Sequence, residues 1–580
     1  MRKAKVSLKR RNLSIWISIF LWVYISININ AQNFIHINQL GYFANGSKVA
    51  MLTDMDADTY TLRLARNNQV VFSGMANPQK TWNSSGENIQ MIDFSEFKTP
   101  GKYYVQIGTE RSYPFEIRQS GNYDSLAVWT MKAFYLWRAS CPIEAKYATY
   151  MGVNYARQTG HPDTVVYIHK GVANEKRHIE SEVNGTKGWY DASDYNKYVV
   201  NAGFSIQFIA LLNELYPEYC KNLRLNIPET GNGVPDILNE LKWELDWMLS
   251  MQDPTDGGVY FKLTTLAFSK MEMPSQDQDD RYMVGKSTSS ALNFASSMAV
   301  AARLFAPYDS VFPNYSNKML EAAKKAYEWA VIHPNSAFKN PEDVTTGEYG
   351  DNYFSDEFFL ANVQLFISTG NKKYYDKIKF TQTYDSPTWH DENSLGLIEM
   401  AIHIDNLPQY VDKNQIGIKF KGLSESIYKQ YYYNVGKVPI KKFEWGSNGV
   451  VATNGAIEGI AYKISGDTKF KEAATASFDY LLGRNSLDYC FVTRFGTRYP
   501  HNIHDRRTQS DGITEPLPGY LVGGPNKDEM TDCGQTNYPS SIYPARAYLD
   551  DICSYSTNEI AINWNAPFVL LTGIIINENK

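Results

Sequence analysis

The chain has 580 residues, of which 43% are hydrophobic and 21% are charged. This composition is typical of globular proteins with a large core, so it excludes wholesale disorder, and the length predicts roughly two to four domain-sized units. Lys and Arg total 57 against 62 Asp and Glu, and the net charge of −5 gives no electrostatic reason to expect nucleic acid as a partner. The five Cys residues include no Cys-x-x-Cys pair, so neither a disulfide framework nor a zinc ribbon is expected.

The first 31 residues have the order of an export signal. Residues 1–12 carry six Lys or Arg and no acid, an apolar run follows from Ile15 to about Ile27, and Ala31 closes a short polar stretch. The apolar run is shorter than the roughly 20 residues of a membrane-spanning helix. We therefore expect a cleaved signal over residues 1–31 and a secreted or periplasmic mature chain without a membrane span; an uncleaved anchor is the alternative.

Strand signals dominate residues 33–118. Apolar residues alternate with small or polar ones in residues 49–53 and 60–64, and another apolar stretch follows the turn at Pro100–Gly101. Short strands with turns about every ten residues predict a small β-sandwich.

Helical periodicity replaces the strand pattern in residues 121–580. The clearest helix begins at Pro235, a residue suited to the first turn, and places Leu238, Leu241 and Leu245 on one face. About a dozen such segments, separated by long loops, fit a toroid of helical hairpins with functional loops at one end. The segments are 124–139, 202–216, 236–251, 287–305, 318–332, 356–368, 393–403, 422–433, 455–463, 470–482 and 559–576.

The first of three candidate clusters runs from Gly188 to Tyr198. Asp191 and Asp194 lie three apart with only small residues between them, so their carboxylates can converge on one water or metal ion. Flanking aromatic residues such as Tyr190 would shield and shape that point. An acidic turn that caps a helix is the alternative interpretation.

The other two clusters lie near the C-terminus. Residues 495–507 include His504 and Arg506, whose side chains donate hydrogen bonds to sugar hydroxyls or to carboxylates; a solvated basic loop is the alternative. Glu559 lies among apolar neighbours with Trp564 close by, a setting that raises a carboxyl pKa as a general acid requires. A helix N-terminal Glu that interacts with the helix dipole is the alternative for this third cluster.

In this order the three clusters resemble the motifs of glycoside hydrolase family 9, the inverting endoglucanases. The first motif matches Asp191-Ala192-Ser193-Asp194, with Ser193 where the family has Gly. Residues 35–42 are similar to the opening of the immunoglobulin-like module that precedes the catalytic domain in one branch of this family. The other matching positions are Thr493, Gly496, Arg498, Ile503, His504 and Arg506 in the second motif and Tyr548, Asp550, Tyr555, Glu559, Ala561, Asn565 and Ala566 in the third, while Cys490 departs from the pattern.

The resemblance implies a multidomain fold, with an immunoglobulin-like β-sandwich over 33–118 and an all-α (α/α)6 barrel over 121–580. It implies that Asp194 is the catalytic base, that Asp191 helps to hold the attacking water, and that Glu559 is the catalytic acid. The substrate-binding residues expected beside them are His504, Arg506, Trp564 and Tyr190.

The implied function is inverting hydrolysis of β-1,4-glucosidic bonds inside cellulose, mixed-linkage glucan or xyloglucan. In inverting enzymes the two carboxyl groups lie about 6.5–9.5 Å apart, because a water molecule must fit between the base and the sugar, and we expect this separation for Asp194 and Glu559. An exo-acting glucosidase or glucosaminidase on the same scaffold is one alternative. A non-catalytic glycan-binding protein is a second, although binding alone does not need a matched acid and base.

The chemistry needs no cofactor, but a structural calcium ion is a further expectation. Asp356 and Glu357, with the more distant Asp391, form an oxygen-rich group suited to a hard cation, and Glu348 and Asp351 lie nearby in the sequence. A solvated acidic loop is the alternative. Some relatives bind zinc through two Cys and two His, but here Cys141 and His161 have no second Cys before Asp191, so a zinc site is doubtful. We expect a monomer whose partner is a β-glucan.

Overall fold

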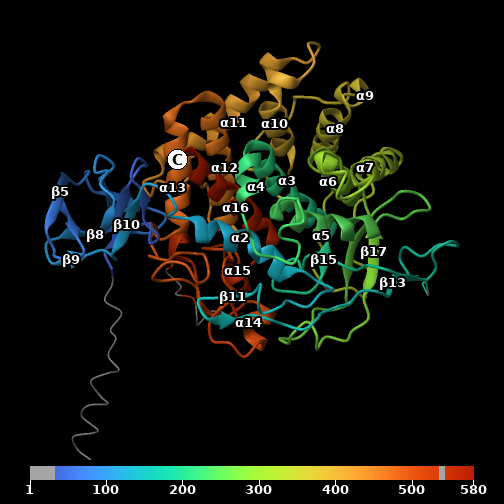
Figure 1. Cartoon of the computed structure of the whole chain (residues 1–580), viewed down its shortest axis with the longest axis horizontal. Coiled ribbons are helices and arrows are strands. Elements are labelled where there is room, and N and C mark those ends of the chain that lie inside the picture. The colour runs from blue at the N-terminus through green and yellow to red at the C-terminus, as the bar shows by residue number, and fades with distance from the viewer. Residues whose placement is uncertain (1–32, 180, 535–537, 539–541, 580) are drawn as a thin grey trace, which may run out of the picture.

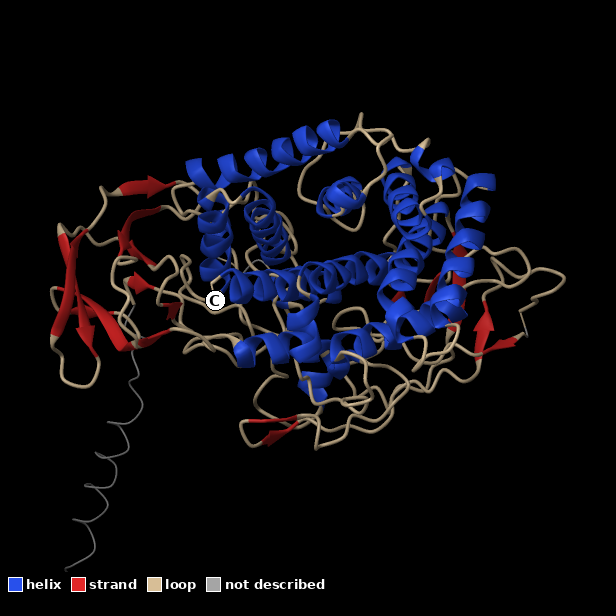
Figure 2. Ribbon diagram, turned by 45° about the horizontal axis from the view of Figure 1, so that its top comes forward, coloured by secondary structure: helices blue, strands red, loops and turns tan. Residues whose placement is uncertain are grey.

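The computed structural model describes residues 33–179, 181–534, 538 and 542–579, so the export signal predicted for residues 1–31 lies outside the described residues. A small β domain at the N-terminal end lies beside a larger helical domain (Figure 1). Figure 2 shows the long loops of the helical domain gathered along one side of its helices. Within the described residues, no helix is long and apolar enough to cross a membrane.

The N-terminal domain is a sandwich of two sheets. Its core is formed by alternating side chains of facing strands, among them Leu52, Tyr60 and Val105. One sheet has the order β1 (Ile35–His36), β3 (Val49–Thr53), β7 (Glu87–Asp93), β6 (Lys80–Trp82). The other has the order β2 (Tyr42–Phe43), β10 (Phe115–Arg118), β8 (Gly101–Ile107), β4 (Thr59–Leu64), β5 (Val70–Met75), with β9 (Glu110–Arg111) paired to β8. This confirms the predicted β-sandwich.

The helical domain is a ring of packed helices that begins at α2. Neighbouring helices contact one another in the circular order α3, α6, α8, α10, α11, α12, α16, and α16 closes the ring on α3. The helices α7 and α13 pack against this ring, on α6 and α12. This arrangement confirms the expected (α/α)6 barrel. The described helices of four or more residues are α2 (Asp124–Trp137), α3 (Val199–Leu215), α4 (Pro217–Asn222), α5 (Asp236–Ser250), α6 (Thr288–Phe305), α7 (Tyr315–Ile332), α8 (Ser355–Thr369), α9 (Lys372–Tyr375), α10 (Asn393–Ile402), α11 (Lys413–Tyr433), α12 (Ser447–Ser465), α13 (Thr468–Leu481), α14 (Arg506–Ser510), α15 (Tyr555–Asn558) and α16 (Ile562–Glu578).

Helices α11 and α12 begin well before the positions that their apolar patterns predict, at Lys413 instead of 422 and at Ser447 instead of 455. Helix α11 starts at Lys413 because Asp412 caps it, accepting a hydrogen bond from Gln415 N at 2.9 Å. Helix α12 starts at Ser447 with small residues that periodicity does not detect; Gly449 is needed there because an added Cβ would lie 2.6 Å from the Trp564 ring.

The loops of the helical domain also contain strands that the periodicity missed. A five-stranded sheet has the order β14 (Glu182–Val183), β13 (Val166–Ile168), β17 (Tyr282–Lys286), β16 (Tyr260–Thr264), β15 (Lys197–Tyr198), and β11 (Thr149–Tyr150) pairs with β12 (Val153–Asn154). Strand β15 follows Asp194 directly and leads into α3, so this sheet supports the first candidate cluster.

The β domain holds two loops of the helical domain. Gln39 Oε1 accepts hydrogen bonds from Thr497 N at 2.8 Å and Arg498 N at 2.9 Å. Glu87 forms an ion pair with Arg546 at 3.1 Å. The preceding residue, Ala545, donates its backbone N–H to Ser84 O at 2.8 Å. The loops so held lead into the second and third candidate clusters.

The apolar part of this interface predicts a large stability effect. Trp82 of β6 is 3% exposed, belongs to the core of the helical domain and packs on Phe443, with ring centroids 6.3 Å apart. Trp82→Ala should lower the free energy of unfolding by about 3–5 kcal/mol because it leaves a cavity between the domains. Met75→Ala, at a side chain 76% exposed on the same domain, should change it by less than about 0.5 kcal/mol in the same denaturant titration. Equal effects of the two substitutions would contradict a coupled interface.

Candidate active site

The three clusters meet at one place although they lie far apart in the sequence. Ile562 N, at the start of α16, donates to Asp191 O at 3.0 Å. His504 N donates to Asn558 O at 3.0 Å, and the same segment forms a parallel bridge between His504 and Glu559. Backbone hydrogen bonds therefore fix the positions of all three clusters relative to one another.

Asp191 and Asp194 are buried at 2% and 6% exposure. Asp191 accepts hydrogen bonds from Asn201 Nδ2 and from Tyr349 Oη, each at 2.7 Å. Burial, and then the nearby charge of Asp194, raises the pKa of Asp191 well above its ordinary value. Ionisation of Asp191 therefore costs free energy, and the hydrogen bonds from Asn201 and Tyr349 reduce that cost.

A separate set of donors orients Asp194. Its Oδ2 atom accepts from Asn196 Nδ2 at 2.6 Å and from Tyr198 Oη at 3.3 Å. Thr264 Oγ1 donates to Asn196 Oδ1 at 2.9 Å, which fixes the amide so that its NH₂ group faces Asp194. Sequence reasoning missed these partners: Asn196 and Tyr198 stand next to the motif, but Tyr349 lies in a distant loop without any local signal.

The apolar pattern predicts that Glu559 begins a helix. In the structure it lies instead in the short extended connection between α15 and α16. Ser193 Oγ donates a hydrogen bond to Glu559 Oε1 at 2.6 Å. Burial raises the pKa of Glu559 to about 7, and the charge of Asp194 also raises it, while Ser193 and Arg506 lower it. The residue as a whole is half-buried.

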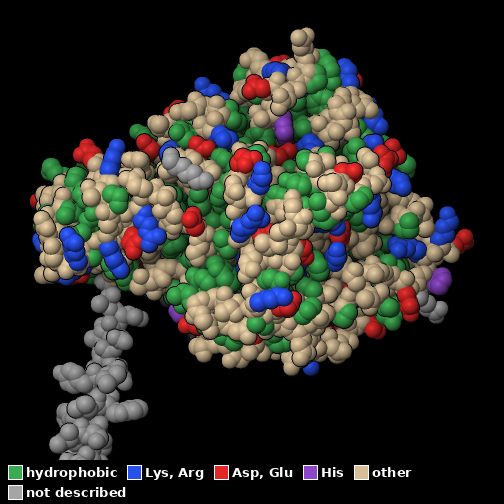
Figure 3. All heavy atoms as spheres, viewed as in Figure 1, with side chains coloured by type: hydrophobic (Ala, Val, Ile, Leu, Met, Phe, Trp, Pro, Cys, Tyr) green, Lys and Arg blue, Asp and Glu red, His purple; other side chains and the backbone are tan. Residues whose placement is uncertain are grey.

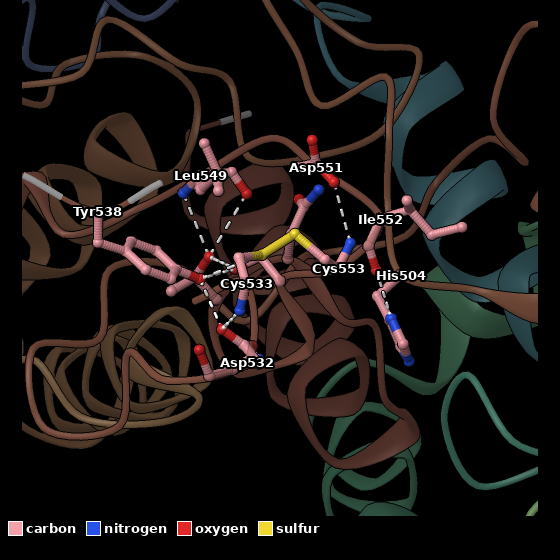
Figure 4. Close-up of a disulfide and its surroundings, with 12 residues drawn as sticks. His504, Asp532, Cys533, Tyr538, Leu549, Asp551, Ile552 and Cys553 are labelled. Carbon is pink, nitrogen blue, oxygen red and sulfur yellow. Dashed lines mark hydrogen bonds between the residues drawn. A yellow bond between two sulfur atoms is a disulfide. The ribbon is translucent and has the colours of Figure 1, made fainter. Parts of the chain in front are cut away.

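His504 is held by a loop that a disulfide closes (Figure 4). Cys533 and Cys553 form this bond, and Ile552 O accepts a hydrogen bond from His504 Nδ1 at 2.6 Å. Because a carbonyl only accepts, Nδ1 carries the proton, and burial lowers the pKa of the imidazole. No disulfide framework is expected from the sequence, and the described residues contain this one bond, with partners 20 residues apart, while Cys141, Cys220 and Cys490 are free.

The other predicted binding residues have different surroundings. Arg506 is 8% exposed, with Nε donating to Ser269 O at 2.9 Å. Trp564 is half-buried at the start of α16. The prediction that Tyr190 binds substrate does not agree with its position. Its side chain is 0% exposed and its hydroxyl forms a hydrogen bond with His161 Nδ1 at 2.9 Å, so it packs beneath the site and does not face a ligand.

The acidic group predicted to bind calcium lies at the N-terminal ends of α8 and α10. Asp356 Oδ2 accepts from Glu392 N at 2.8 Å, while Asp391 Oδ1 accepts from Asn393 N at 3.2 Å. Both carboxylate oxygens of Glu357 and of Glu392 are buried without a hydrogen-bond partner. Burial first, and then the charge of Asp356, raises the pKa of both groups. Sequence reasoning missed Glu392, which directly precedes the helix pattern beginning at 393.

Soft-metal ligands do not converge around His161. Its Nε2 atom lies 3.1 Å from Asp277 Oδ2 and its Nδ1 bonds Tyr190, so both ring nitrogens are in use. Two compact ligand groups occur in the part of the chain that the structure describes, Cys533–Asp551–Cys553 and Glu214–Glu399–His403. The sulfurs of the first form the disulfide, and Arg303 already neutralises the second, at 3.0 Å from Glu214.

Charged side chains of both signs are interspersed over the visible face of the molecule (Figure 3). No single basic region dominates that face, as the net charge of −5 leads one to expect.

Comparison with known proteins places this geometry in a family. The family model described as Glycosyl hydrolase family 9 matches residues 106–572, and the one described as Cellulase N-terminal ig-like domain matches residues 30–112. A xyloglucan-specific endo-beta-1,4-glucanase of Bacteroides ovatus is 36% identical over 94% of both chains. Endoglucanase D of Acetivibrio thermocellus is 30% identical over 96% of this chain and 85% of its own.

Solved structures agree with the sequence matches. The structure described as Bacteroides ovatus GH9 is 34% identical and has a TM-score of 0.87, covering 94% of this chain and 99% of its own. A thermostable endoglucanase from Alicyclobacillus acidocaldarius is 26% identical, with a TM-score of 0.84 over 94% of this chain and 100% of its own.

Proposed function

The chain belongs to glycosyl hydrolase family 9, and on that premise we propose that it hydrolyses β-1,4-glucosidic bonds within β-glucan chains. The observation that carries the proposal is the meeting of Asp191, Asp194 and Glu559 at one site, held by Ser193 and by backbone bonds between their loops. A glycan-binding protein would not need three carboxyl groups at one site, one of them with its pKa raised to about 7.

The proposed mechanism is a single displacement with inversion. Glu559, kept protonated by burial, gives its proton to the glycosidic oxygen. Asp194 takes a proton from a water that attacks the anomeric carbon from the opposite face, and Asp191 helps to hold that water. The polar bonds from Asn196 and Asn201 keep both carboxylates oriented for this task.

The substrate-contacting residues in this proposal are His504, Arg506 and Trp564. His504 has its Nδ1 proton committed to Ile552 O, which fixes the plane of the imidazole. Xyloglucan is the first substrate candidate because the relative from Bacteroides ovatus with 36% identity is named for it, and cellulose and mixed-linkage glucan follow.

We further propose export from the cytoplasm, with residues 1–31 as the signal. The Cys533–Cys553 disulfide supports this proposal because such bonds persist in oxidising compartments. Polymeric glucan cannot enter a cell, so an enzyme that cuts it internally acts outside.

A structural calcium ion is also part of the proposal. Glu357 and Glu392, with Asp356 beside them, would hold it after drawing together, because the three are not among the compact ligand groups of the described residues. Four buried and unpartnered oxygens of Glu357 and Glu392 suit a hard cation. Asp391 would contribute from the rim of the group. The ion would supply neutralising charge at the ends of α8 and α10 and take no part in the chemistry.

Removing the proposed acid or base should abolish hydrolysis. Glu559→Gln and Asp194→Ala should each lower kcat on soluble β-glucan by roughly 10²–10⁴-fold, because each removes one proton-transfer group. In the wild type, kcat should fall as pH rises through about 7, where Glu559 loses its proton. Glu321→Gln, at an exposed acid of α7 paired only with Lys324, is the matched control and should keep full activity.

Glu559→Gln also tests whether burial raises the pKa of Glu559. A raised carboxyl pKa gives stability that is complete below the unfolded value and is lost as pH rises through about 7. Glu559→Gln should therefore match or exceed the wild-type melting temperature at pH 8. Retained activity in either active-site variant would contradict the assignment.

Product analysis tests the mode of cleavage. Early digests of xyloglucan, mixed-linkage glucan and soluble cellulose derivatives should contain oligomers of mixed size, and NMR should show the α anomer first because inversion converts a β bond. Release of a single sugar from one end would show exo action on the same scaffold, and a β product would refute inversion. Failure to cut every β-glucan would refute the proposed function.

Chelation tests the calcium proposal. EGTA should lower the melting temperature by a few degrees, because a ligand that binds only the folded state stabilises it by mass action. Glu392→Gln should lose this response, while Asp343→Asn, at a half-exposed acid paired with Lys170, should keep it. A wild-type melting curve that is identical with EGTA and with added calcium would rule the site out.

A further inference from the structure

Ser193 connects the proposed acid with the first motif. It lies in the turn between Asp191 and Asp194 and is 1% exposed. Its Oγ atom donates to Glu559 Oε1 at 2.6 Å and lies 3.3 Å from Arg506 Nη1, which donates to it.

The chemistry of the neighbours fixes the direction of these bonds. A guanidinium group can only donate, so Ser193 Oγ must accept from Arg506. The one proton of the hydroxyl is then free for its other partner, and Ser193 Oγ donates it to Glu559 Oε1. In a protonated carboxyl group the carbonyl oxygen is the better acceptor, so Oε1 takes this bond and Oε2 is the atom that carries the acidic proton.

We propose that Ser193 is a positioning residue that holds Oε1 of Glu559 as an acceptor, keeps the transferable proton on Oε2, and stabilises the carboxylate that remains after transfer. This proposal rests on the proposed function. During the step the Oε2–H bond breaks and the proton goes to the glycosidic oxygen, whose bond to the anomeric carbon breaks. The water oxygen bonds that carbon, and its proton goes to Asp194.

The Ser193 bond favours the transition state over the bound substrate. Hydrogen bonds to a charged acceptor are stronger than bonds to a neutral one, and Glu559 gains a full negative charge as its proton leaves. A contact that strengthens along the reaction lowers the barrier. Arg506 also stabilises the negative charge on Glu559, whereas Asp194 and Asp191 destabilise it. His504 is next to Glu559 through a backbone bridge.

The test compares Ser193→Ala with Ser193→Thr, which keeps a hydroxyl. Ser193→Ala should lower kcat on polymeric glucan roughly tenfold with little change in KM. The alkaline limb of its kcat profile should move to higher pH, because the lost donor had favoured the ionised form. Ser193→Thr should restore part of kcat and return the alkaline limb part of the way to its wild-type pH. Ser424→Ala, at a buried Ser of α11 that bonds only Phe420 O, is the matched control and should change neither.

A substrate with a different leaving group can show whether Ser193→Ala impairs protonation by Glu559 or only the packing of the site. A nitrophenyl glycoside has a weakly basic leaving group that departs without full protonation, so the loss in Ser193→Ala should shrink on this substrate. A loss of equal size on both substrates, without movement of the alkaline limb, would overturn the proposal in favour of a packing role.

A direct titration makes the inference independent of activity. Carbon-13 NMR of labelled Glu side chains, with Glu559→Gln to assign the signal, should show the Glu559 pKa higher in Ser193→Ala than in the wild type. An unchanged titration overturns the inference even if the enzyme is active. If the wild type cuts no β-glucan but the titration shifts as expected, the proposed function fails and the coupling of Ser193 to Glu559 stands.

Discussion

Closure of the helical ring is the constraint on which the site depends. Helix α16, the last in the chain, packs against α3, and the loops that precede these two helices meet at the same end. Ser193 and Glu559, 366 positions apart, thereby come within hydrogen-bond distance. Neither half of the site exists without the other, so the folding of the whole ring is a precondition for the chemistry.

The second constraint is electrostatic. Three carboxyl groups in a poorly hydrated site repel one another, and ionising all of them would be expensive. Buried amides and hydroxyls, such as Asn201 and Tyr349, offset the cost for the groups that must be anions. Burial raises the pKa of Glu559 to about 7, and it also raises the pKa of Asp191 well above its ordinary value. Burial therefore favours sharing of protons among these groups, and the hydrogen-bond donors oppose it.

Much of this architecture is visible in the sequence. Helical periodicity and the change near residue 120 predict the β-sandwich and the barrel, and three short motifs identify the carboxylates. The rest depends on contacts between loops, which have no periodicity. Tyr349 reaches Asp191 across 158 positions, and Glu392 joins Glu357 only because α8 and α10 are neighbours in the ring. Tyr190 shows the opposite error, since an aromatic residue beside a motif can equally be part of the core.

The grip of Gln39 on the backbone of Thr497 and Arg498 has an evolutionary consequence. The side chain of Gln39 belongs to the N-terminal domain but accepts from two backbone amides of the segment that leads to His504. Exchange of this domain for an unrelated one would leave both amides without that acceptor. Selection for an ordered segment at 497–498 would therefore act on residue 39 as well.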